Sequence, residues 1–288
     1  MRLATCEYRG KIRLARAQEG GLDLLPEAMG SSFRQLMAGA GLVPLQSVTG
    51  TRVGGQEVKF LPPIPDADKI LCVGFNYRGH AAETGTPLPK HPSIFVRFAA
   101  SQVGHEQPVL APSISAEFDY EGELAVIIGK AAWRVAAVDA MQYVAGYSCF
   151  AENSVRDFQS HARQATAGKN FLASGAFGPS LVTRDEIPDP AALELSTRLN
   201  GVVVQHAKLT DLIFSIPELI EYITKFTRLL PGDVISTGTP DGVGFLRKPP
   251  VYLKPGDHLE VDIPGVGLLR NQVIAEADGV GASGEIKS

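Results

Sequence analysis

Cysteine is scarce in this chain, and its few residues lie far apart. The 288 residues include only three cysteines, Cys6, Cys72 and Cys149. The odd number and the wide spacing argue against a disulfide framework and against a metal site built from CxxC pairs. Because apolar residues lie near each cysteine, we expect buried, reduced thiols in a cytosolic protein.

The sequence also lacks long apolar segments and runs of basic residues. Its N-terminus has no apolar stretch of the secretory type, and no segment approaches the roughly 20 apolar residues that span a bilayer. Lysine and arginine total 27 against 31 acidic residues, which gives a net charge of −4. Nucleic-acid-binding proteins usually show a basic excess. We therefore expect a soluble, cytoplasmic protein that binds neither membranes nor nucleic acids.

Short strand-like runs separated by glycine and proline dominate the chain from about residue 69 onward. The clearest helix is predicted over Ile216–Leu230, because Ser215 and Glu218 match a capping box and Pro231 follows the apolar periodicity. Strands outnumber helices and do not alternate regularly with them, so the sequence predicts mixed β with peripheral helices, not a doubly wound sheet. The strand-like runs include Ile70–Val73, Ser93–Phe98, Glu123–Ile128, Val234–Ser236 and His258–Ile263.

Residues 1–65 are predicted to form a small N-terminal α+β domain. Two strand-like runs, Arg2–Tyr8 and Lys11–Gln18, flank Arg9-Gly10, a pattern typical of a hairpin. A short amphipathic helix is expected to start at Ser31. The prolines of residues 61–66 restrict the backbone and predict an extended connector. Residues 66–288 would then form the second, larger domain.

Two glutamates precede a strongly apolar strand-like run. Glu121 and Glu123 are two residues apart, so a strand would place both side chains on one face, with Asp119 behind them. Neighbouring carboxylates repel each other and are costly to bury, and a divalent cation with a preference for oxygen ligands would offset that cost. A solvated edge strand with ordinary acidic residues is the alternative.

Glu152 is the candidate third metal ligand. An apolar strand-like segment ends just before it, and the residues that follow look helical. A helix starting there would place Arg156 one turn and Gln159 two turns further along the same face. The alternative is an exposed helix start with an acidic residue near its N-terminus, which is favourable by itself.

His80 and Glu83 have the spacing of neighbours on a helix, where a carboxylate can orient an imidazole for acid–base work. The following loop, residues 84–92, is rich in glycine and proline and would serve as a lid. Lys169, between small and apolar residues, could stabilise a developing enolate. The alternatives are a surface histidine with a local ion pair and a solvated lysine.

In this order along the chain, the motifs resemble the fumarylacetoacetate hydrolase family. The resemblance covers most of residues 69–271. The matching stretches are GFNYRGHAAE, FDYEGELAVIIGK, VAGYSCFAENSVRDFQ, GKNF, FGPSLVT, NGVVVQ, LLPGDVISTGTPDGVG and LKPGDHLEVDIPGVG.

The resemblance implies a fumarylacetoacetase C-terminal-like β-roll catalytic domain, usually in a homodimer, and a role for each matching residue. The metal, Mg²⁺ or Mn²⁺ with Ca²⁺ possible, would be held by Glu121, Glu123 and Glu152. Glutamate at 152 departs from the usual aspartate, as do Leu172 from an aspartate and Ala176 from a proline. The catalytic residues would be His80, Glu83 and Lys169, and the substrate-binding residues Tyr77, Arg156, Gln159 and Thr239.

The activity implied first is hydrolysis of a carbon–carbon bond in a 2,4-dioxo acid of the acylpyruvate type, giving pyruvate and a carboxylic acid. The family also isomerises 2-hydroxy-diene acids and decarboxylates oxaloacetate through a shared enolate. A catalytically silent relative that only binds a small 2-oxo acid is the alternative from another functional class, and the departure at Glu152 motivates it.

Overall fold

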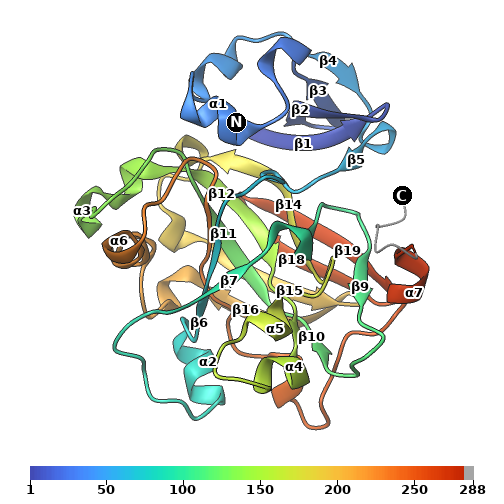
Figure 1. Ribbon diagram of the computed structural model, residues 1–288, viewed down its shortest axis with the longest axis vertical. Helices are drawn as coiled ribbons and strands as arrows, with labels where there is room; N and C mark the ends of the chain where they lie inside the picture. The colour runs from blue at the N-terminus through green and yellow to red at the C-terminus, as the bar shows by residue number, and fades with distance from the viewer. Residues whose placement is uncertain (282–288) are drawn as a thin grey trace.

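One large, mostly antiparallel sheet runs through the molecule from its N-terminal unit to an edge at β7. The computed structural model describes residues 1–281. The sheet has the strand order β4-β3-β2-β1-β14-β12-β11-β17-β6-β7, and β5 and β8 pair with β1 and β14 (Figure 1). Its strands are β1 (Arg2–Tyr8), β2 (Lys11–Gln18), β3 (Gly21–Leu24), β4 (Thr51–Val53), β5 (Lys59–Phe60), β6 (Ile70–Gly74), β7 (Ser93–Arg97), β8 (Gln102–Val103), β11 (Gly122–Ile128), β12 (Val144–Ala151), β14 (Gly175–Thr183) and β17 (Val234–Ser236).

A second sheet packs against the centre of the first, and the two share one hydrophobic core. It has the order β16-β15-β18-β19-β9, and a separate pair joins β10 to β13. Leu124 and Val126 of β11 belong to the same buried cluster as Val261 of the second sheet. The strands are β9 (Val109–Ala111), β10 (Phe118–Asp119), β13 (Ser154–Val155), β15 (Glu194–Leu199), β16 (Val202–Lys208), β18 (His258–Ile263) and β19 (Gly267–Ala275).

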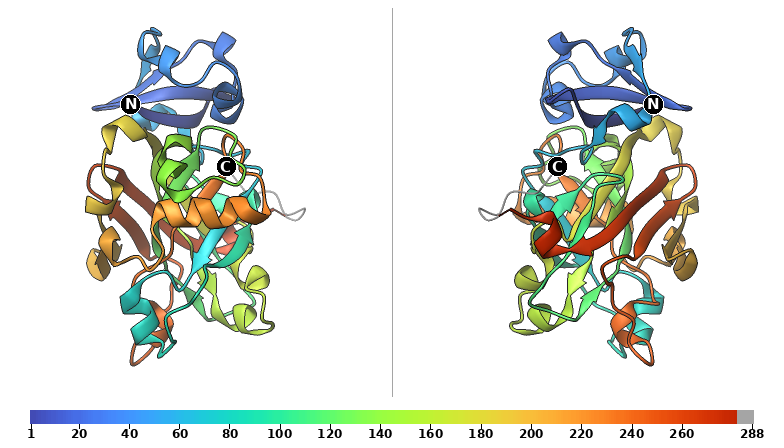
Figure 2. Two further views of the ribbon diagram at one scale, coloured as in Figure 1. Left: turned by 90° about the vertical axis from the view of Figure 1, so that its left-hand side faces the viewer. Right: turned by 90° about the vertical axis from the view of Figure 1, so that its right-hand side faces the viewer.

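The helices are short and lie outside the sheets, as the sequence predicts. Figure 1 shows α2, α4 and α5 together at the end of the molecule remote from the N-terminal unit. Figure 2 shows α6 lying across the outside of the strands, with α3 beside it. The mixed β architecture with peripheral helices is therefore confirmed. The helices are α1 (Phe33–Ala38), α2 (Arg78–Glu83), α3 (Ala137–Ala140), α4 (Arg156–Ser160), α5 (Thr166–Lys169), α6 (Ile216–Phe226) and α7 (Glu276–Gly279).

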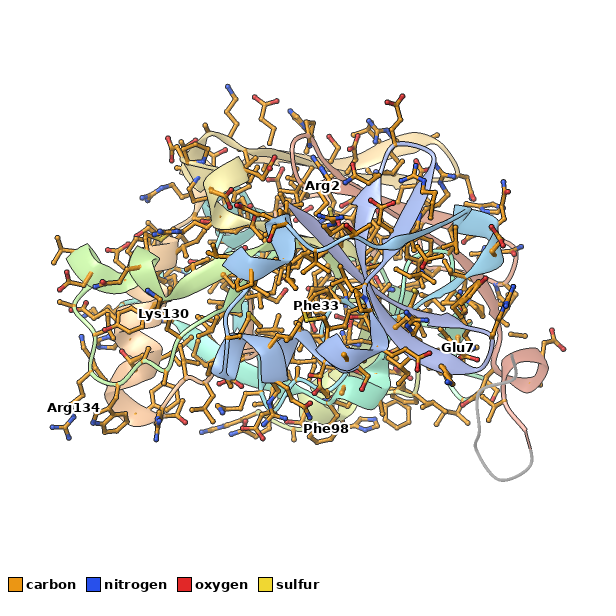
Figure 3. The ribbon with its side chains drawn as sticks, turned by 90° about the horizontal axis from the view of Figure 1, so that it is seen from above. Arg2, Glu7, Phe33, Phe98, Lys130 and Arg134 are labelled. Atoms are coloured by element: carbon orange, nitrogen blue, oxygen red, sulfur yellow. The ribbon has the colours of Figure 1, made fainter. Side chains whose placement is uncertain are left out.

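The N-terminal unit contains the predicted hairpin, β1 and β2 around Arg9-Gly10. Its helix α1 begins at Phe33, two residues after the expected start at Ser31, and the side chain of Ser32 caps it by accepting from the Gln35 amide. Figure 3 looks down on this unit, with the buried Phe33 near its centre. Pairing of β1 with β14 joins the unit to the large sheet.

Helix α6 ends at Phe226, four residues before the predicted end at Leu230. The capping box of Ser215 and Glu218 is present at its start. At its end, Thr227 is extended, and Leu229 then exchanges two backbone hydrogen bonds with Ala132. The helix therefore stops where its chain pairs with a distant segment, which the apolar periodicity does not reveal.

Two further expectations concern the cysteines and membrane-spanning segments. Cys6, Cys72 and Cys149 are free and buried, as predicted. Within residues 1–281, no helix has the length and apolar character needed to cross a membrane.

Candidate active site

Two antiparallel strand pairs, β11 with β12 and β10 with β13, bring Glu152 close to Glu121 and Glu123. In β11 and β12, Gly122 faces Ala151, while β10 and β13 pair Asp119 with Ser154. In the gap between these ladders, the Glu152 amide donates to the Glu121 carbonyl over 2.8 Å. The strand pairing therefore sets the third predicted ligand directly beside the first two.

Gly122, between the two glutamates, allows the second sheet to approach β11 closely. A Cβ atom at this position would lie 2.0 Å from the Thr197 hydroxyl of β15. The Gly122 amide donates to Gln205 of β16, whose own amide group donates to Thr239. Because Gly122 has no side chain, β15 can pack closely against it, and the hydrogen bonds through Gln205 hold Thr239 in place behind the carboxylates.

The three glutamates form one buried acidic cluster. Carboxylate oxygens of Glu121, Glu123 and Glu152 lie within 4.8 Å of one another. Their exposed fractions are 5%, 2% and 0%, so the alternative of a solvated edge strand is wrong. Glu123 accepts from the Ser236 hydroxyl over 2.6 Å and from the Gly238 amide over 2.8 Å, both through Oε2.

Lys169 lies inside this cluster and is 2% exposed. Its ammonium donates to both carboxylate oxygens of Glu121 at 3.1 Å and forms a short ion pair with Glu152. Gly168 makes this position possible, because a Cβ there would lie 2.5 Å from the Gln159 amide nitrogen. Close packing of α5 on α4 thus turns Lys169 inward, and the alternative of a solvated lysine is wrong.

Arg156 and Gln159 line the same cavity, but the helix that carries them begins later than predicted. Strand β12 ends at Ala151, Ser154 and Val155 form β13, and α4 begins only at Arg156. Arg156 donates to Gln159 over 2.9 Å, and it forms ion pairs with Asp119 and Glu121 at 2.8 Å. The prediction that Glu152 starts this helix is wrong, because Ser154 and Val155 pair with β10 instead.

His80 and Glu83 lie on α2, as predicted. Their closest atoms, Nδ1 and Oε2, are 3.4 Å apart. The Gly242 amide donates to the Glu83 carboxylate over 3.1 Å, which ties α2 to the loop after β17. This arrangement holds the carboxylate near Nδ1 and leaves Nε2 of His80 for the cavity.

Backbone amides of residues 238–244 bind carboxylates of the chain itself. This loop thereby fixes acidic groups that come from three separate segments. The pairs are Gly238 with Glu123, Gly242 with Glu83 and Gly244 with Asp119.

Thr239 and Tyr77 differ in their relation to the cavity. Thr239 lines it, and its hydroxyl donates to the Gly122 carbonyl over 3.1 Å. Tyr77 is 1% exposed, belongs to the hydrophobic core cluster and is not among the residues that line the cavity. Tyr77 precedes α2 in an extended conformation, and its contact with the substrate stays a prediction.

Arg97 is a site residue that sequence reasoning missed. This arginine, the last residue of β7, is 2% exposed. Its guanidinium donates to Glu152 over 2.8 Å, to the Asn153 carbonyl over 2.8 Å and to Ser174 over 2.9 Å. An arginine directly after an apolar run was the available signal, but its partner is 55 residues away in sequence.

Together these residues enclose a cavity of about 490 Å³. Twelve of its lining residues are charged or polar, and the apolar ones lie on three separate segments of the chain. The polar lining residues that matter most are His80, Glu117, Glu121, Glu123, Glu152, Arg156, Gln159, Lys169 and Thr239, and the apolar ones are Val73, Phe75, Phe95, Phe245 and Leu246.

Burial and the neighbouring charges shift the pKa values of the three glutamates in different directions. Burial opposes ionisation of Glu121, but Lys169 and Arg156 outweigh it and hold the pKa of Glu121 below its usual range. Burial raises the pKa of Glu152, although Lys169 and Arg97 oppose the shift. Burial, with the charges of Glu152 and Glu121, raises the pKa of Glu123 well above its usual range. Negative charge at Glu123 is thus the least compensated.

This imbalance fits a divalent cation. Glu123 accepts hydrogen bonds only through Oε2 among the described residues, so Oε1 is left for another ligand. The cluster offers carboxylate oxygens alone, which are the donors that Mg²⁺, Mn²⁺ and Ca²⁺ prefer. The buried acidic triad therefore has the chemistry to bind a divalent metal.

Comparison with known proteins gives consistent results. A family model described as fumarylacetoacetate (FAA) hydrolase C-terminal matches residues 69–274. The human oxaloacetate tautomerase FAHD2A, mitochondrial, is 44% identical over 220 residues, 76% of this chain and 70% of that protein. The oxaloacetate tautomerase YisK of Bacillus subtilis is 41% identical over 221 residues, 75% of this chain and 73% of that protein.

Solved structures share the whole fold. Fumarylacetoacetate hydrolase from Exiguobacterium antarcticum superposes with a TM-score of 0.86 at 32% identity, covering 96% of this chain and 100% of that one. Maleylpyruvate hydrolase from Sphingobium sp. SYK-6, solved with manganese(II) and pyruvate, has a TM-score of 0.78 at 27% identity, with 96% and 99% coverage.

Replacing Glu123 with Gln should stabilise the metal-free protein at neutral and alkaline pH. A buried acid with a raised folded-state pKa contributes stability below its unfolded pKa and loses it as pH rises through the folded value. After EDTA treatment, E123Q should therefore melt above the wild type near about pH 8, by about 2–4 °C per kcal/mol, with a smaller difference near about pH 5.

The same variant tests the metal site by calorimetry. Mg²⁺ or Mn²⁺ should raise the melting temperature of the wild type but not that of E123Q, because a ligand that binds only the folded state stabilises it. An equal metal-induced increase in both proteins would contradict the assignment of Glu123 as a ligand.

Arg97→Met should destabilise the fold strongly. Removing one partner of a buried ion pair leaves an uncompensated charge, here part of Glu152, and costs about 3–5 kcal/mol. Urea unfolding measures the difference. The matched control is Arg198→Met, which breaks a half-exposed pair with Asp262 and should cost less than about 1 kcal/mol. Similar stabilities for the two variants would show that Arg97 does not hold the cluster together.

Proposed function

This chain belongs to the fumarylacetoacetate hydrolase family, and from that premise we propose that it catalyses keto–enol isomerisation of a small 2-oxo acid. The observation that carries the proposal is the meeting of an oriented histidine and a buried lysine around one acidic cluster. Relatives more than 40% identical are named oxaloacetate tautomerases, which supports proton transfer as the reaction.

The metal would be held by Glu121, Glu123 and Glu152. A divalent cation bound there supplies Lewis-acid stabilisation of the negative charge that develops on the 2-oxo oxygen when C3 loses its proton. We propose Mg²⁺ or Mn²⁺, with Ca²⁺ as a further possibility. The manganese in the maleylpyruvate hydrolase structure supports this choice.

His80 would move the proton. With the Glu83 carboxylate beside Nδ1, the proton of a neutral imidazole is held on that nitrogen, and Nε2 carries the free lone pair. Nε2 would accept a proton from C3 of the keto acid and return it to the oxygen of the enolate, or the reverse. General acid–base help of this kind contributes about 10²–10⁴ in rate.

Lys169 and the polar lining would bind and orient the acid. The Lys169 ammonium supplies positive charge inside the cavity, where low polarity strengthens its attraction for an enolate. Arg156, Gln159 and Thr239 line the same cavity and offer hydrogen bonds to the carboxylate.

A metal-dependence assay tests the proposal. EDTA-treated protein is mixed with the enol forms of oxaloacetate and phenylpyruvate, and decay of the enol absorbance is followed before and after addition of Mg²⁺ or Mn²⁺. Metal-dependent acceleration of ketonisation with at least one acid is expected. No acceleration by protein to which metal binding has been demonstrated would overturn the proposed activity.

His80→Ala should lower the rate by about 10²–10⁴ while leaving the melting temperature and the metal-induced stabilisation near those of the wild type. The matched control is His206→Ala, which removes an exposed histidine outside the cavity and should leave turnover unchanged. Unchanged turnover in H80A would eliminate this residue as the acid–base group.

Hydrolysis of an acylpyruvate is the second candidate. The His80–Glu83 pair favours it, because the same pair can activate water for attack on a 4-carbonyl, followed by release of pyruvate. Product analysis separates the reactions. A second carboxylic acid indicates hydrolysis, CO₂ indicates decarboxylation, and an unchanged mass indicates isomerisation. A metal-loaded protein that binds 2-oxo acids without turnover would be the silent relative.

A further inference from the structure

Three phenylalanines form an apolar wall next to the polar groups of the cavity. We call Phe75, Phe95 and Phe245 the phenylalanine wall. Each ring stacks on or lies beneath one polar group of the site. The pairs are Phe75 with His80 at 5.6 Å between ring centroids, Phe95 with Lys169 at 5.1 Å from the ammonium, and Phe245 with Arg156 at 4.3 Å from the guanidinium.

Phe75 is the most accessible member of the wall. It is 40% exposed, whereas most large apolar side chains of the chain are buried. Its φ of 55° lies in the left-handed region, which is uncommon for residues other than glycine and concentrates at functional sites. The chain thus holds an aromatic ring, in an unfavourable backbone conformation, at the solvent side of the cavity and parallel to His80 within 14°.

The charges of the lining residues disfavour a second substrate carboxylate. The lining contains four carboxylates, those of Glu117 and the acidic triad, against two permanent cations. Both cations already have partners: Arg156 pairs with Asp119 and Glu121, and Lys169 pairs with Glu121 and Glu152. A divalent metal would neutralise the formal excess and leave no unpaired cation among the lining residues for a distal carboxylate.

We infer that this site prefers a 2-oxo acid with a flat apolar group on C3, aryl or alkenyl, to a 2-oxo dicarboxylic acid. The inference rests on the proposed function and names the substrate class of the same cavity. The acid end would lie at the triad and the apolar group against the phenylalanine wall. The cavity of about 490 Å³ lies within the range of about 300–1,000 Å³ that is typical for small-molecule sites, and it leaves room for such a group.

The test compares phenylpyruvate with oxaloacetate on the full chain loaded with Mg²⁺ or Mn²⁺. Wild-type kcat/KM should favour phenylpyruvate by about tenfold or more. Phe75→Ala should lower kcat/KM for phenylpyruvate by about tenfold and for oxaloacetate by less than about twofold. A wild-type preference for oxaloacetate would overturn the inference.

Further variants separate the ring from its backbone and from its effect on His80. Phe75→Gly removes the ring and suits a positive φ, so a loss shared by F75A and F75G belongs to the ring. Phe75→Arg should shift preference toward oxaloacetate by supplying an unpaired cation. The matched control, Phe226→Ala, removes a ring that is 56% exposed and outside the cavity. Equal losses with both acids would mean that the ring only positions His80, which also overturns the inference.

Calorimetric binding distinguishes failure of this inference from failure of the proposed function. Metal-loaded protein should bind phenylpyruvate more tightly than oxaloacetate, and F75A should lose about tenfold in affinity for phenylpyruvate alone. This pattern without turnover would support the apolar subsite and overturn the isomerase. Turnover of oxaloacetate together with tighter binding of oxaloacetate would support the isomerase and overturn the apolar subsite.

Discussion

The structure depends on compensating the negative charge of three glutamates buried in one place. Carboxylates within 4.8 Å of one another repel strongly where water is excluded. Lys169 and Arg156 neutralise Glu121, and Lys169 with Arg97 neutralises Glu152. These cations come from α5, α4 and β7, so each element must be in place before the cluster is tolerable. Formation of the site and packing of these elements therefore depend on the same charge compensation.

Glycines make this arrangement sterically possible. Gly122 lets β15 approach the strand that carries the acidic pair, and Gly168 lets α5 press against α4 so that Lys169 turns inward. In each case a Cβ atom would lie at or below 2.5 Å from a neighbouring atom. Small residues thus set the distances between elements, and the charged residues beside them take their positions from that packing.

Glu152 illustrates how a longer acid can be accommodated. Arg97 binds Oε1 of its carboxylate and Lys169 approaches Oε2, so the two oxygens are held by different cations. The residue lies directly after β12, and its amide donates to the Glu121 carbonyl. Glu152 therefore keeps its carboxylate beside the other two, with both oxygens already hydrogen-bonded.

The sequence by itself determined the features that depend on local patterns. The β1–β2 hairpin, the capping box of α6 and the i, i+3 geometry of His80 and Glu83 follow from neighbours in the chain. The sequence also indicated the acidic pair, because Glu121 and Glu123 are two residues apart around the start of β11, where an extended chain places both side chains on one face.

Only the tertiary structure decided the rest, because the contacts join residues far apart in sequence. Three features leave no periodic signal: the contact of Glu152 with Arg97 of β7, the phenylalanine wall, and the early end of α6 before Leu229 pairs with Ala132. Tyr77 shows a related limit: the resemblance assigned it to the substrate, and only the structure shows that it is buried in the core cluster and outside the cavity lining. Local spacing fixes which side chains can share a face, whereas packing of the elements decides what that face meets.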